Sequence, residues 1–375
     1  MEFHPQLRAH MDSLFQRRAS DLYLSTGNRP ALRIDGDVLP VQTGTLTGAQ
    51  LEAIVRALLG SERMGQLLQQ REFDFSFAYG NQGRIRANAF YTQGDLALAL
   101  RLIPHEIPSM EDLELPRGAR LLADLPRGLV LVTGPTGSGK STTLAAMVRH
   151  INETKPAHIV TIEDPIEYLH APGRSVIEQR EVGLDTLSFA NGLRSALRQN
   201  PDVVLIGEMR DPETIAIAVT LAETGHLVFA TLHTSDAPGA IDRIIDVFPG
   251  SQQQQIRIQL AASLMGVVAQ LLLPRVGGGR VACFEVMLAN PAVRGQIREG
   301  KTQTLRTTII TGVADGMQSM EMSLVDRVKR GQIRLEDAQA RSLHHEELTS
   351  LLKQGGLSAA AAGPLARRAG VAPAS

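Results

Sequence analysis

The sequence predicts an α/β fold whose larger part is built around a largely parallel β-sheet. Short apolar segments typical of strands alternate with helical segments over residues 128–232, which is the rhythm of repeated βαβ units. One strand-like segment, "LVLVT", runs directly into a glycine-rich turn that opens a helix. The chain has 375 residues, 43% of them apolar, so it can bury the cores of two domains.

The first domain is predicted to be α+β and to cover residues 1–103. It opens with a helical segment, continues with strand-like residues, and returns to helix where Thr47 stands in the N-cap position. A meander of strands with glycine turns closes the domain. In order, we expect a helix over 3–18, strands within 19–41, helices over 46–60 and 61–70, and strands within 72–104.

A proline-rich, acidic stretch, 104–118, is predicted to link this domain to a second one, 119–353. Helices are predicted to dominate the second domain from Ser251 onward. Residues 354–375 are rich in small side chains and are predicted to be disordered. Within the second domain we expect strands in 128–134, 158–164, 202–208 and 226–232, and helices over 142–153, 188–199 and 213–224.

Composition excludes several classes of protein. The formal net charge is −1, so the basic surface typical of a nucleic-acid-binding protein is absent in bulk. The one cysteine, Cys283, allows neither a disulfide framework nor a cysteine zinc site, and its apolar surroundings indicate a buried thiol. The N-terminus lacks the apolar core of a signal peptide, and no apolar run is long enough to span a bilayer. We therefore expect a cytoplasmic protein that meets the membrane only through partners.

The glycine-rich turn matches the phosphate-loop pattern G-x-x-x-x-G-K-[ST]. Glycines let backbone N–H groups face an anion, and the helix that follows directs its positive end toward the same anion. Lys140 is expected to reach the β- and γ-phosphates of a nucleoside triphosphate, and Ser141 to ligate Mg²⁺. The predicted ATP-binding residues are Gly134, Pro135, Thr136, Gly137, Ser138, Gly139, Lys140, Ser141 and Thr142.

Two further apolar strands end in acidic residues, Glu163 and Glu208. The carboxyl ends of parallel strands meet at one edge of a sheet, so both carboxylates are expected to face the bound phosphates. One would hold Mg²⁺ through water, and the other would orient or deprotonate the attacking water. The sequence leaves open which acid does which, because Glu208 stands where an aspartate is usual. The alternative is that each acid only caps the turn after its strand.

Two histidines flank the last predicted strand of this region, with His226 before it and His233 after it. We expect both to lie beside the same crevice and to sense or position a ligand there. The alternative is that each is a surface group that only makes hydrogen bonds.

Several segments along the chain together resemble the secretion ATPase superfamily, and within it the type IV pilus retraction ATPases. The resemblance extends from about Ala19 to Arg341. It implies a homohexameric ring in which each subunit pairs a PAS-like N-terminal domain with a RecA-like C-terminal domain, and ATP lies between the two. The segments that carry it are "ASDLYLSTGNRPALRIDG", "RIRANAF", "LRLIPHEIPSMEDLELP", the phosphate loop, "VTIEDPIEY", "QREVGLDTLSFANGLRSALRQNPDVVLIGEMRDPETI", "ETGHLVFATLHTSDA" and "IDRIIDVFP".

The resemblance also implies roles for individual residues. It makes Glu163 the catalytic glutamate, Glu208 the Walker B acid, and the segment from His226 to His233 the histidine box. Basic residues of the N-terminal domain complete the site in this family. The matching positions are Arg84, Arg86 and Arg101, for which the alternative is solvation on a strand face.

The implied function is ATP-driven retraction of type IV pili in twitching motility, at the cytoplasmic face of the inner membrane. The four-cysteine insertion of assembly ATPases is missing, and residues 292–302 replace the "AIRNLIRE" element of retraction ATPases in altered form. There Arg294 and Arg298 are expected to share a basic face for a partner, unless the helix packs within its own domain. The implied partners are an inner-membrane platform protein and a paralogous retraction ATPase, with no nucleic acid. The alternatives are an assembly or type II secretion ATPase and an accessory retraction subunit.

Overall fold

A computed structural model describes residues 3–17, 19–34, 37–41, 43–80, 83–103 and 106–354. The chain divides into two compact units of mixed α/β structure, which agrees with the predicted class. The N-terminal unit takes the described residues up to Ile107 together with Pro165–Leu169, and the C-terminal unit takes the rest. Apart from Gln354, where the last helix ends, the tail predicted to be disordered lies outside the described residues.

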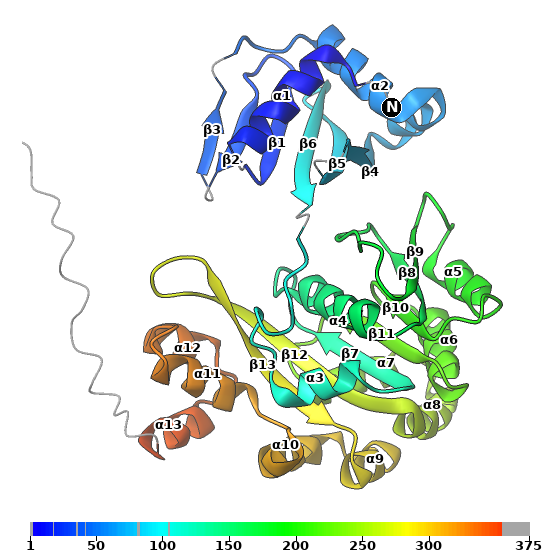
Figure 1. The fold of residues 1–375 in the computed structure, drawn as a ribbon, viewed down its shortest axis with the longest axis vertical. Coiled ribbons are helices and arrows are strands. Elements are labelled where there is room, and N and C mark those ends of the chain that lie inside the picture. The colour runs from blue at the N-terminus through cyan, green and yellow to red at the C-terminus, as the bar shows by residue number, and fades with distance from the viewer. Residues whose placement is uncertain are drawn as a thin grey trace, which may run out of the picture. The chain divides into compact units, whose positions relative to one another are not determined.

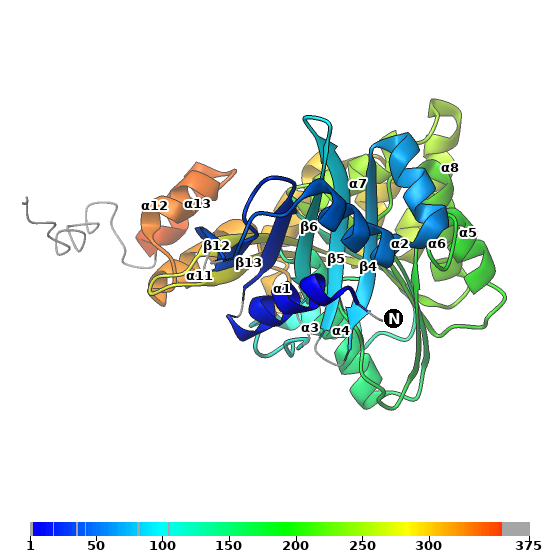
Figure 2. The same cartoon turned by 90° about the horizontal axis from the view of Figure 1, so that it is seen from above.

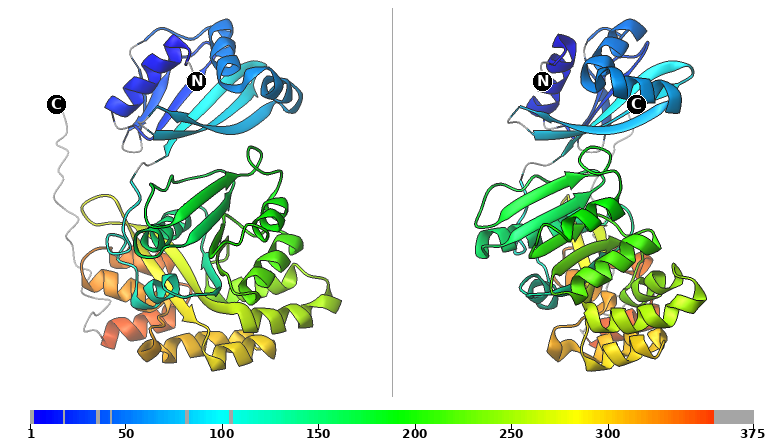
Figure 3. Two further views of the ribbon diagram at one scale, coloured as in Figure 1. Left: turned by 45° about the vertical axis from the view of Figure 1, so that its right-hand side comes forward. Right: turned by 90° about the vertical axis from the view of Figure 1, so that its right-hand side faces the viewer.

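The N-terminal unit is an antiparallel sheet with helices on one face (Figure 3). Its six strands follow the order β3-β2-β1-β6-β5-β4. Alternate side chains of the strands point to the helix face and join the apolar side chains of both helices in one core. The elements are α1 (Pro5–Gln16), β1 (Asp21–Ser25), β2 (Ala31–Ile34), β3 (Asp37–Pro40), α2 (Gly48–Gln70), β4 (Glu72–Tyr79), β5 (Gly83–Thr92) and β6 (Asp95–Ile103).

Helix α2 confirms the predicted N-cap. The Thr47 hydroxyl accepts from the backbone N–H of Gln50, and the Gln50 side chain accepts from the backbone N–H of Thr47, which completes a capping box. Gly60 interrupts the helix with φ 71° and ψ −178°, at the junction of the two predicted helices. Among the described residues, no helix combines the length and apolar character needed to cross a membrane.

The C-terminal unit is built on a sheet of seven strands in the order β13-β12-β7-β11-β10-β8-β9 (Figure 1). All neighbours are parallel except the β12–β13 pair. The strands are β7 (Gly128–Thr133), β8 (His158–Glu163), β9 (Val176–Glu181), β10 (Val203–Ile206), β11 (Leu227–Leu232), β12 (Leu264–Pro274) and β13 (Arg280–Leu288). The α-helices are α3 (Arg117–Ala123), α4 (Lys140–Thr154), α5 (Phe189–Ala196), α6 (Pro212–Glu223), α7 (Ala237–Asp246), α8 (Gly250–Ser263), α9 (Pro291–Arg298), α10 (Leu305–Thr311), α11 (Met320–Lys329), α12 (Leu335–Arg341) and α13 (His345–Gln354).

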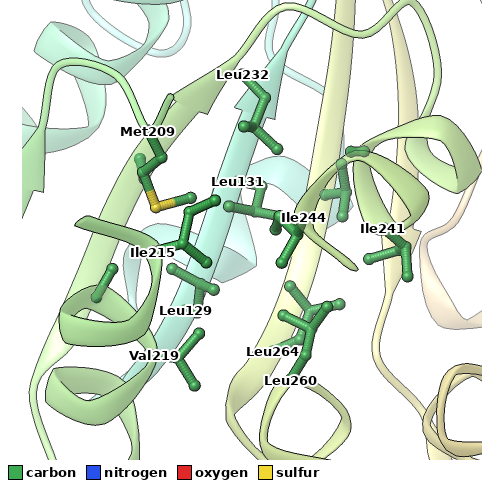
Figure 4. Close-up of a cluster of buried hydrophobic side chains, with 14 of the residues drawn as sticks. Leu129, Leu131, Met209, Ile215, Val219, Leu232, Ile241, Ile244, Leu260 and Leu264 are labelled. Atoms are coloured by element: carbon green, nitrogen blue, oxygen red, sulfur yellow. The ribbon is translucent and has the colours of Figure 1, made fainter. Parts of the chain in front are cut away.

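Helices cover both faces of this sheet, which explains why its central strands are mostly apolar, with threonines as their few buried polar residues. Helices α3 and α4 pack on one face, and α6, α7 and α8 pack on the other. Figure 4 shows the second layer, in which side chains of β7 and β11 meet those of the helices. The labelled residues of that layer are Leu129, Leu131, Met209, Ile215, Val219, Leu232, Ile241, Ile244, Leu260 and Leu264.

The predicted dominance of helices after Ser251 is wrong in part. The long strands β12 and β13 occupy 264–274 and 280–288 and pair along their whole length as a hairpin. An apolar run such as "LMGVVAQLLLP" carries no clear period, so the pattern cannot separate a buried strand from a buried helix. The helix α8 precedes this hairpin and α9 to α13 follow it; α11 packs on β13, with α12 and α13 beside it (Figure 2).

The predicted linker, 104–118, does not form a separate segment over most of its length. From Pro108 onward the chain belongs to the C-terminal unit, where Met110 and Leu115 are buried in the core under α3 and α4. The carboxylate of Glu114 accepts hydrogen bonds from the side chains of Arg327 and Gln332. Apolar burial and these hydrogen bonds hold the stretch on the C-terminal unit, so its proline content was a poor guide to a linker.

Arg294 does not contribute to the predicted basic face on α9. Its guanidinium donates to the backbone carbonyls of Ala261, Ala262 and Ala289 at 2.6, 2.8 and 2.9 Å. It therefore ties α9 to the end of α8 within the same unit, and burial lowers its pKa. Only Arg298 of the pair remains exposed.

The Cys283 thiol should react with a disulfide reagent only when the protein unfolds. It is fully buried on β13, and burial raises its pKa to about 11, so the reactive thiolate is scarce. We expect labelling of the native protein to be slower by orders of magnitude than labelling in denaturing guanidinium, where one thiol per chain should react. Equal rates in the two conditions would show that the thiol is accessible.

Candidate functional site

The candidate site lies at the carboxyl edge of the C-terminal sheet. Strands β7, β11, β10 and β8 are neighbours in that order and run parallel, so the loops that follow them emerge side by side. Four predicted site residues lie at this edge: Lys140 begins α4, Glu163 ends β8, and Glu208 and His233 follow β10 and β11. An edge of this kind is where open parallel sheets bind ligands.

The loop between β7 and α4 has the backbone that a phosphate cradle needs. Gly134, Gly137 and Gly139 have backbone φ angles of 148°, 79° and 90°, which residues other than glycine rarely adopt. A Cβ on Gly134 would lie 2.3 Å from the backbone oxygen of Gln270, and a Cβ on Gly139 would lie 2.8 Å from its side-chain nitrogen. These two glycines are therefore required by the strand beneath the loop, as well as by the turn itself.

Lys140 and Ser138 are polar side chains held inside this loop. Lys140 is buried, and its Nζ donates to the carbonyls of Gly134 and Pro135 at 2.8 and 3.1 Å. The Ser138 hydroxyl is buried and has no hydrogen-bond partner among the described residues. An anion in the loop would give the Ser138 hydroxyl a partner, would lie near the Lys140 ammonium group and would face the N-terminus of α4. The residues present therefore fit a phosphate group.

Gln270 supports the loop from below and was not predicted. It is buried on β12, and its Oε1 accepts a hydrogen bond of 2.8 Å from the Thr143 hydroxyl in the first turn of α4. The side chain thus joins β12 to the start of the helix that follows the phosphate loop. The sequence offered one signal for this role: Gln270 is the single polar residue within the apolar run "VVAQLLLP", and a buried polar group needs a hydrogen-bond partner.

Glu163 is the last residue of β8, and its carboxylate is oriented by two donors. Oε1 accepts from the Thr161 hydroxyl at 2.6 Å and from the Gln179 side chain at 3.3 Å. Gly207, at the end of the neighbouring strand β10, leaves room for this approach, because a Cβ there would lie 3.2 Å from the Glu163 Cα. The two predicted acidic strand ends therefore meet at one edge.

Glu208 lies next to β11 and has two basic neighbours. Its Oε2 is 3.2 Å from His233 Nε2, and its Oε1 is 2.6 Å from the Nε of Arg210, which was not predicted. By strand order, β10 is two strands from β7 and β8 is three, which corresponds to roughly 10 and 14 Å. Glu208 is therefore on the strand nearer to the phosphate loop.

His226 does not lie beside the same crevice as His233, so that expectation is wrong. The two residues flank β11 at opposite ends, about 20 Å apart along a strand of six residues. His226 Nδ1 is 2.9 Å from the carbonyl of Leu221 and 3.1 Å from the hydroxyl of Thr224, at the end of α6. The expectation overlooked the length of the strand, which separates a residue before it from a residue after it.

Polar contacts also hold the loop from His233 to Asp236. Thr133, the residue before Gly134, donates its hydroxyl to the Thr234 carbonyl at 2.7 Å. At the end of this loop, the backbone N–H of Ala237 donates to Glu285 Oε1 at 2.7 Å. Glu285 is 2% exposed on β13, and burial raises its pKa to about 7 from an ordinary 4.5. The sequence pattern did not single out Glu285.

The predicted arginines of the N-terminal unit share one face of its sheet. Arg86 and Arg101 are directly opposite each other on β5 and β6, and Arg84 lies two residues from Arg86. Arg101 donates to Asp21 at 2.7 Å, and Arg84 donates to the Ser76 hydroxyl at 2.6 Å. The opposite face holds the apolar core, so this face is the polar one.

No cluster of three or more His, Cys, Asp or Glu side chains suited to a metal ion occurs among the described residues. Ser141, in the first turn of α4, is half-buried beside the phosphate loop.

Known proteins match this chain over most of its length. A family model described as "Type II/IV secretion system protein" matches residues 3–366. The chain is 48% identical to a twitching motility protein of Neisseria gonorrhoeae, over 85% of this chain and 86% of that protein. It is 46% identical to the type IV pilus retraction ATPase PilT of Pseudomonas aeruginosa, over 86% and 94%. A crystal structure of the pilus retraction motor PilT with bound ADP matches with a TM-score of 0.83 at 46% identity, covering 90% and 97%.

Glu285→Gln should change how stability depends on pH. The folded state raises the pKa of Glu285, so it binds a proton that the unfolded state releases, and stability falls as pH rises from about 4.5 to about 7. The loss in the free energy of unfolding is on the order of 3 kcal/mol. The glutamine stays neutral, so the variant should gain in melting temperature over the wild type between about pH 5 and about pH 8. A constant difference across that range would contradict the raised pKa.

Proposed function

The chain belongs to the type II/IV secretion system protein family, and from this membership we propose that it is an ATPase motor that powers type IV pilus retraction. The observation that carries the proposal is the carboxyl edge, where a phosphate loop and two acidic strand ends lie on neighbouring strands. Two relatives, 48% and 46% identical to this chain, are named for twitching motility and pilus retraction.

The proposed ligand is ATP with Mg²⁺. Lys140 would leave the carbonyls of Gly134 and Pro135 for the β- and γ-phosphates, while backbone N–H groups of 136–142 hold the phosphate oxygens. Ser141 would ligate Mg²⁺, and Glu208 would reach it through water. The bound ion would neutralise charge on the phosphates. Glu208 suits this role because β10 is closer to the phosphate loop than β8.

Glu163 is proposed as the general base. Donors from Thr161 and Gln179 fix its carboxylate, so it can accept a proton from the water that attacks the γ-phosphate. His233 would hold Glu208 in place and report the state of the phosphates to the loop that leads into α7. His226, at the other end of β11, would act only on the end of α6.

We further propose that the N-terminal unit is PAS-like and the C-terminal unit RecA-like. In a homohexameric ring, ATP would lie between the two, and Arg84, Arg86 and Arg101 would contact it from the N-terminal unit. The connection that flexes during turnover would end before Pro108, since the residues that follow pack on the C-terminal unit.

The proposed motor acts at the cytoplasmic face of the inner membrane, on the platform protein of the pilus machine. Successive hydrolysis events around the ring would displace this protein and withdraw pilins from the fibre, with a paralogous ATPase as a possible second motor. Retraction is favoured over assembly because one cysteine cannot build the four-cysteine insertion of assembly ATPases.

Disruption of the gene tests the direction of the motor. A strain that lacks the protein should keep or accumulate surface pili and lose twitching, because fibres would form and not be withdrawn. Pili counted by electron microscopy alongside twitching zones give the answer. Loss of surface pili would replace the proposal with an assembly function.

Glu163→Gln and Glu208→Gln should fail in different ways. The first should bind ATP normally and lose turnover by about 10²–10⁴-fold, the range for loss of a general base. The second should need more Mg²⁺ for half-maximal turnover, because it weakens the hold on the hydrated ion. Phosphate release, titrated with ATP and with Mg²⁺, separates the two effects. Glu178→Gln, an exposed acid on β9, serves as the control and should behave as wild type. The reverse pattern would mean that the two roles are exchanged.

A further inference from the structure

Glu285 is a buried carboxyl group that the proposed hydrolysis does not use. It lies on β13, the outermost strand of the sheet, and it accepts a hydrogen bond from the backbone N–H of Ala237, the first residue of α7. Among the described residues it takes part in no ion pair closer than 4 Å. The groups that act on it electrostatically are Asp236 at the N-cap of α7, Arg306 of α10 and Glu321 of α11.

Burying a carboxyl group without a close ion pair costs free energy, so its hydrogen bond to Ala237 is expected to have a structural role. Burial without a counter-ion disfavours the charged form, as the raised pKa shows. An apolar side chain would avoid this penalty but would leave the Ala237 N–H without a partner. The contact therefore fixes the start of α7 to β13, alongside the Asp236 cap that accepts from the N–H of Gly239.

The start of α7 is four residues from His233. Between them, the Thr234 carbonyl is held by Thr133 at the base of the phosphate loop. The loop from His233 to Asp236 is thus held at β7, through Thr234, and at β13, through Ala237. His233 is its first residue, and its side chain reaches Glu208. If the contact at β13 were released, the loop would keep only the Thr133 contact and α7 could shift along the sheet.

We propose that Glu285 is a positioning residue of the hydrolytic site, which fixes the N-terminus of α7 and thereby keeps His233 within hydrogen-bond distance of Glu208. This inference rests on the proposed ATPase function. Among the described residues, no hydrogen bond or ion pair joins Glu285 to the phosphate loop, to Glu163 or to Glu208, so Glu285 would act on them through the loop from His233 to Asp236.

A double-mutant cycle between Glu285 and His233 tests the inference in the full-length protein. Glu285→Met keeps the side-chain volume and removes the acceptor, so it should lower kcat by about 10-fold and leave KM for ATP within about 2-fold. In the His233→Ala background the same change should lower kcat by less than about 2-fold, because the side chain it positions is gone. Glu285→Gln keeps an acceptor for Ala237 N–H and should restore most of the turnover.

Ser323→Ala is the matched control. The Ser323 hydroxyl accepts from the backbone N–H of Phe284, the residue before Glu285, so its loss also breaks one buried hydrogen bond to β13. It should lower the melting temperature and leave kcat unchanged. If Glu285→Met does not fold, Glu285→Ala replaces it, since the smaller side chain leaves room for water at Ala237 N–H.

The outcomes separate the inference from the function. Effects of Glu285 and His233 that multiply in the double variant, or a Glu285→Gln protein as slow as Glu285→Met, would overturn the positioning role and leave the ATPase intact. A loss of kcat in Ser323→Ala equal to that of Glu285→Met would also overturn it, because general destabilisation would then suffice. A wild-type protein that does not hydrolyse ATP would overturn the proposed function itself.

Discussion

Parallel pairing of β7, β11, β10 and β8 is the constraint on which the rest of the C-terminal unit depends. It brings the loops that carry Lys140, His233, Glu208 and Glu163 to one edge of the sheet in a fixed order. Because each strand is buried on both faces, its apolar residues set the register, and the charged residues of the site stand where the strands end. The chemistry of the edge is therefore a consequence of where each apolar run stops.

The loops at this edge are joined to one another by polar contacts between strands. Thr133, at the base of the phosphate loop, is bonded to Thr234 in the loop that follows β11. His233, in that second loop, is bonded to Glu208. The hairpin of β12 and β13 adds Gln270 under the phosphate loop and Glu285 at the start of α7. Two strands far along the chain thus complete a site whose named motifs all lie before residue 240, which gives the C-terminal hairpin a role beyond packing.

Sequence reasoning succeeded where the signal is local. The phosphate loop, the strand-end acids, the Thr47 cap and the break at Gly60 each depend on residues within a few positions of one another. It failed where the partner is distant: Gln270 meets Thr143 across 127 positions, and Glu285 meets Ala237 across 48. It also failed where a pattern has two interpretations, as in the apolar run of β12, and where the length of a strand was overlooked, as for His226.

Phosphate release by purified Lys140→Ala, compared with wild type under saturating ATP and Mg²⁺, tests the central claim most directly. In the proposed function Lys140 acts on phosphate charge, so we expect a folded variant, with an unchanged circular dichroism spectrum, whose turnover is reduced by about 10²-fold or more. Wild-type turnover in the variant would contradict the assignment of this edge as the ATP-hydrolysing site.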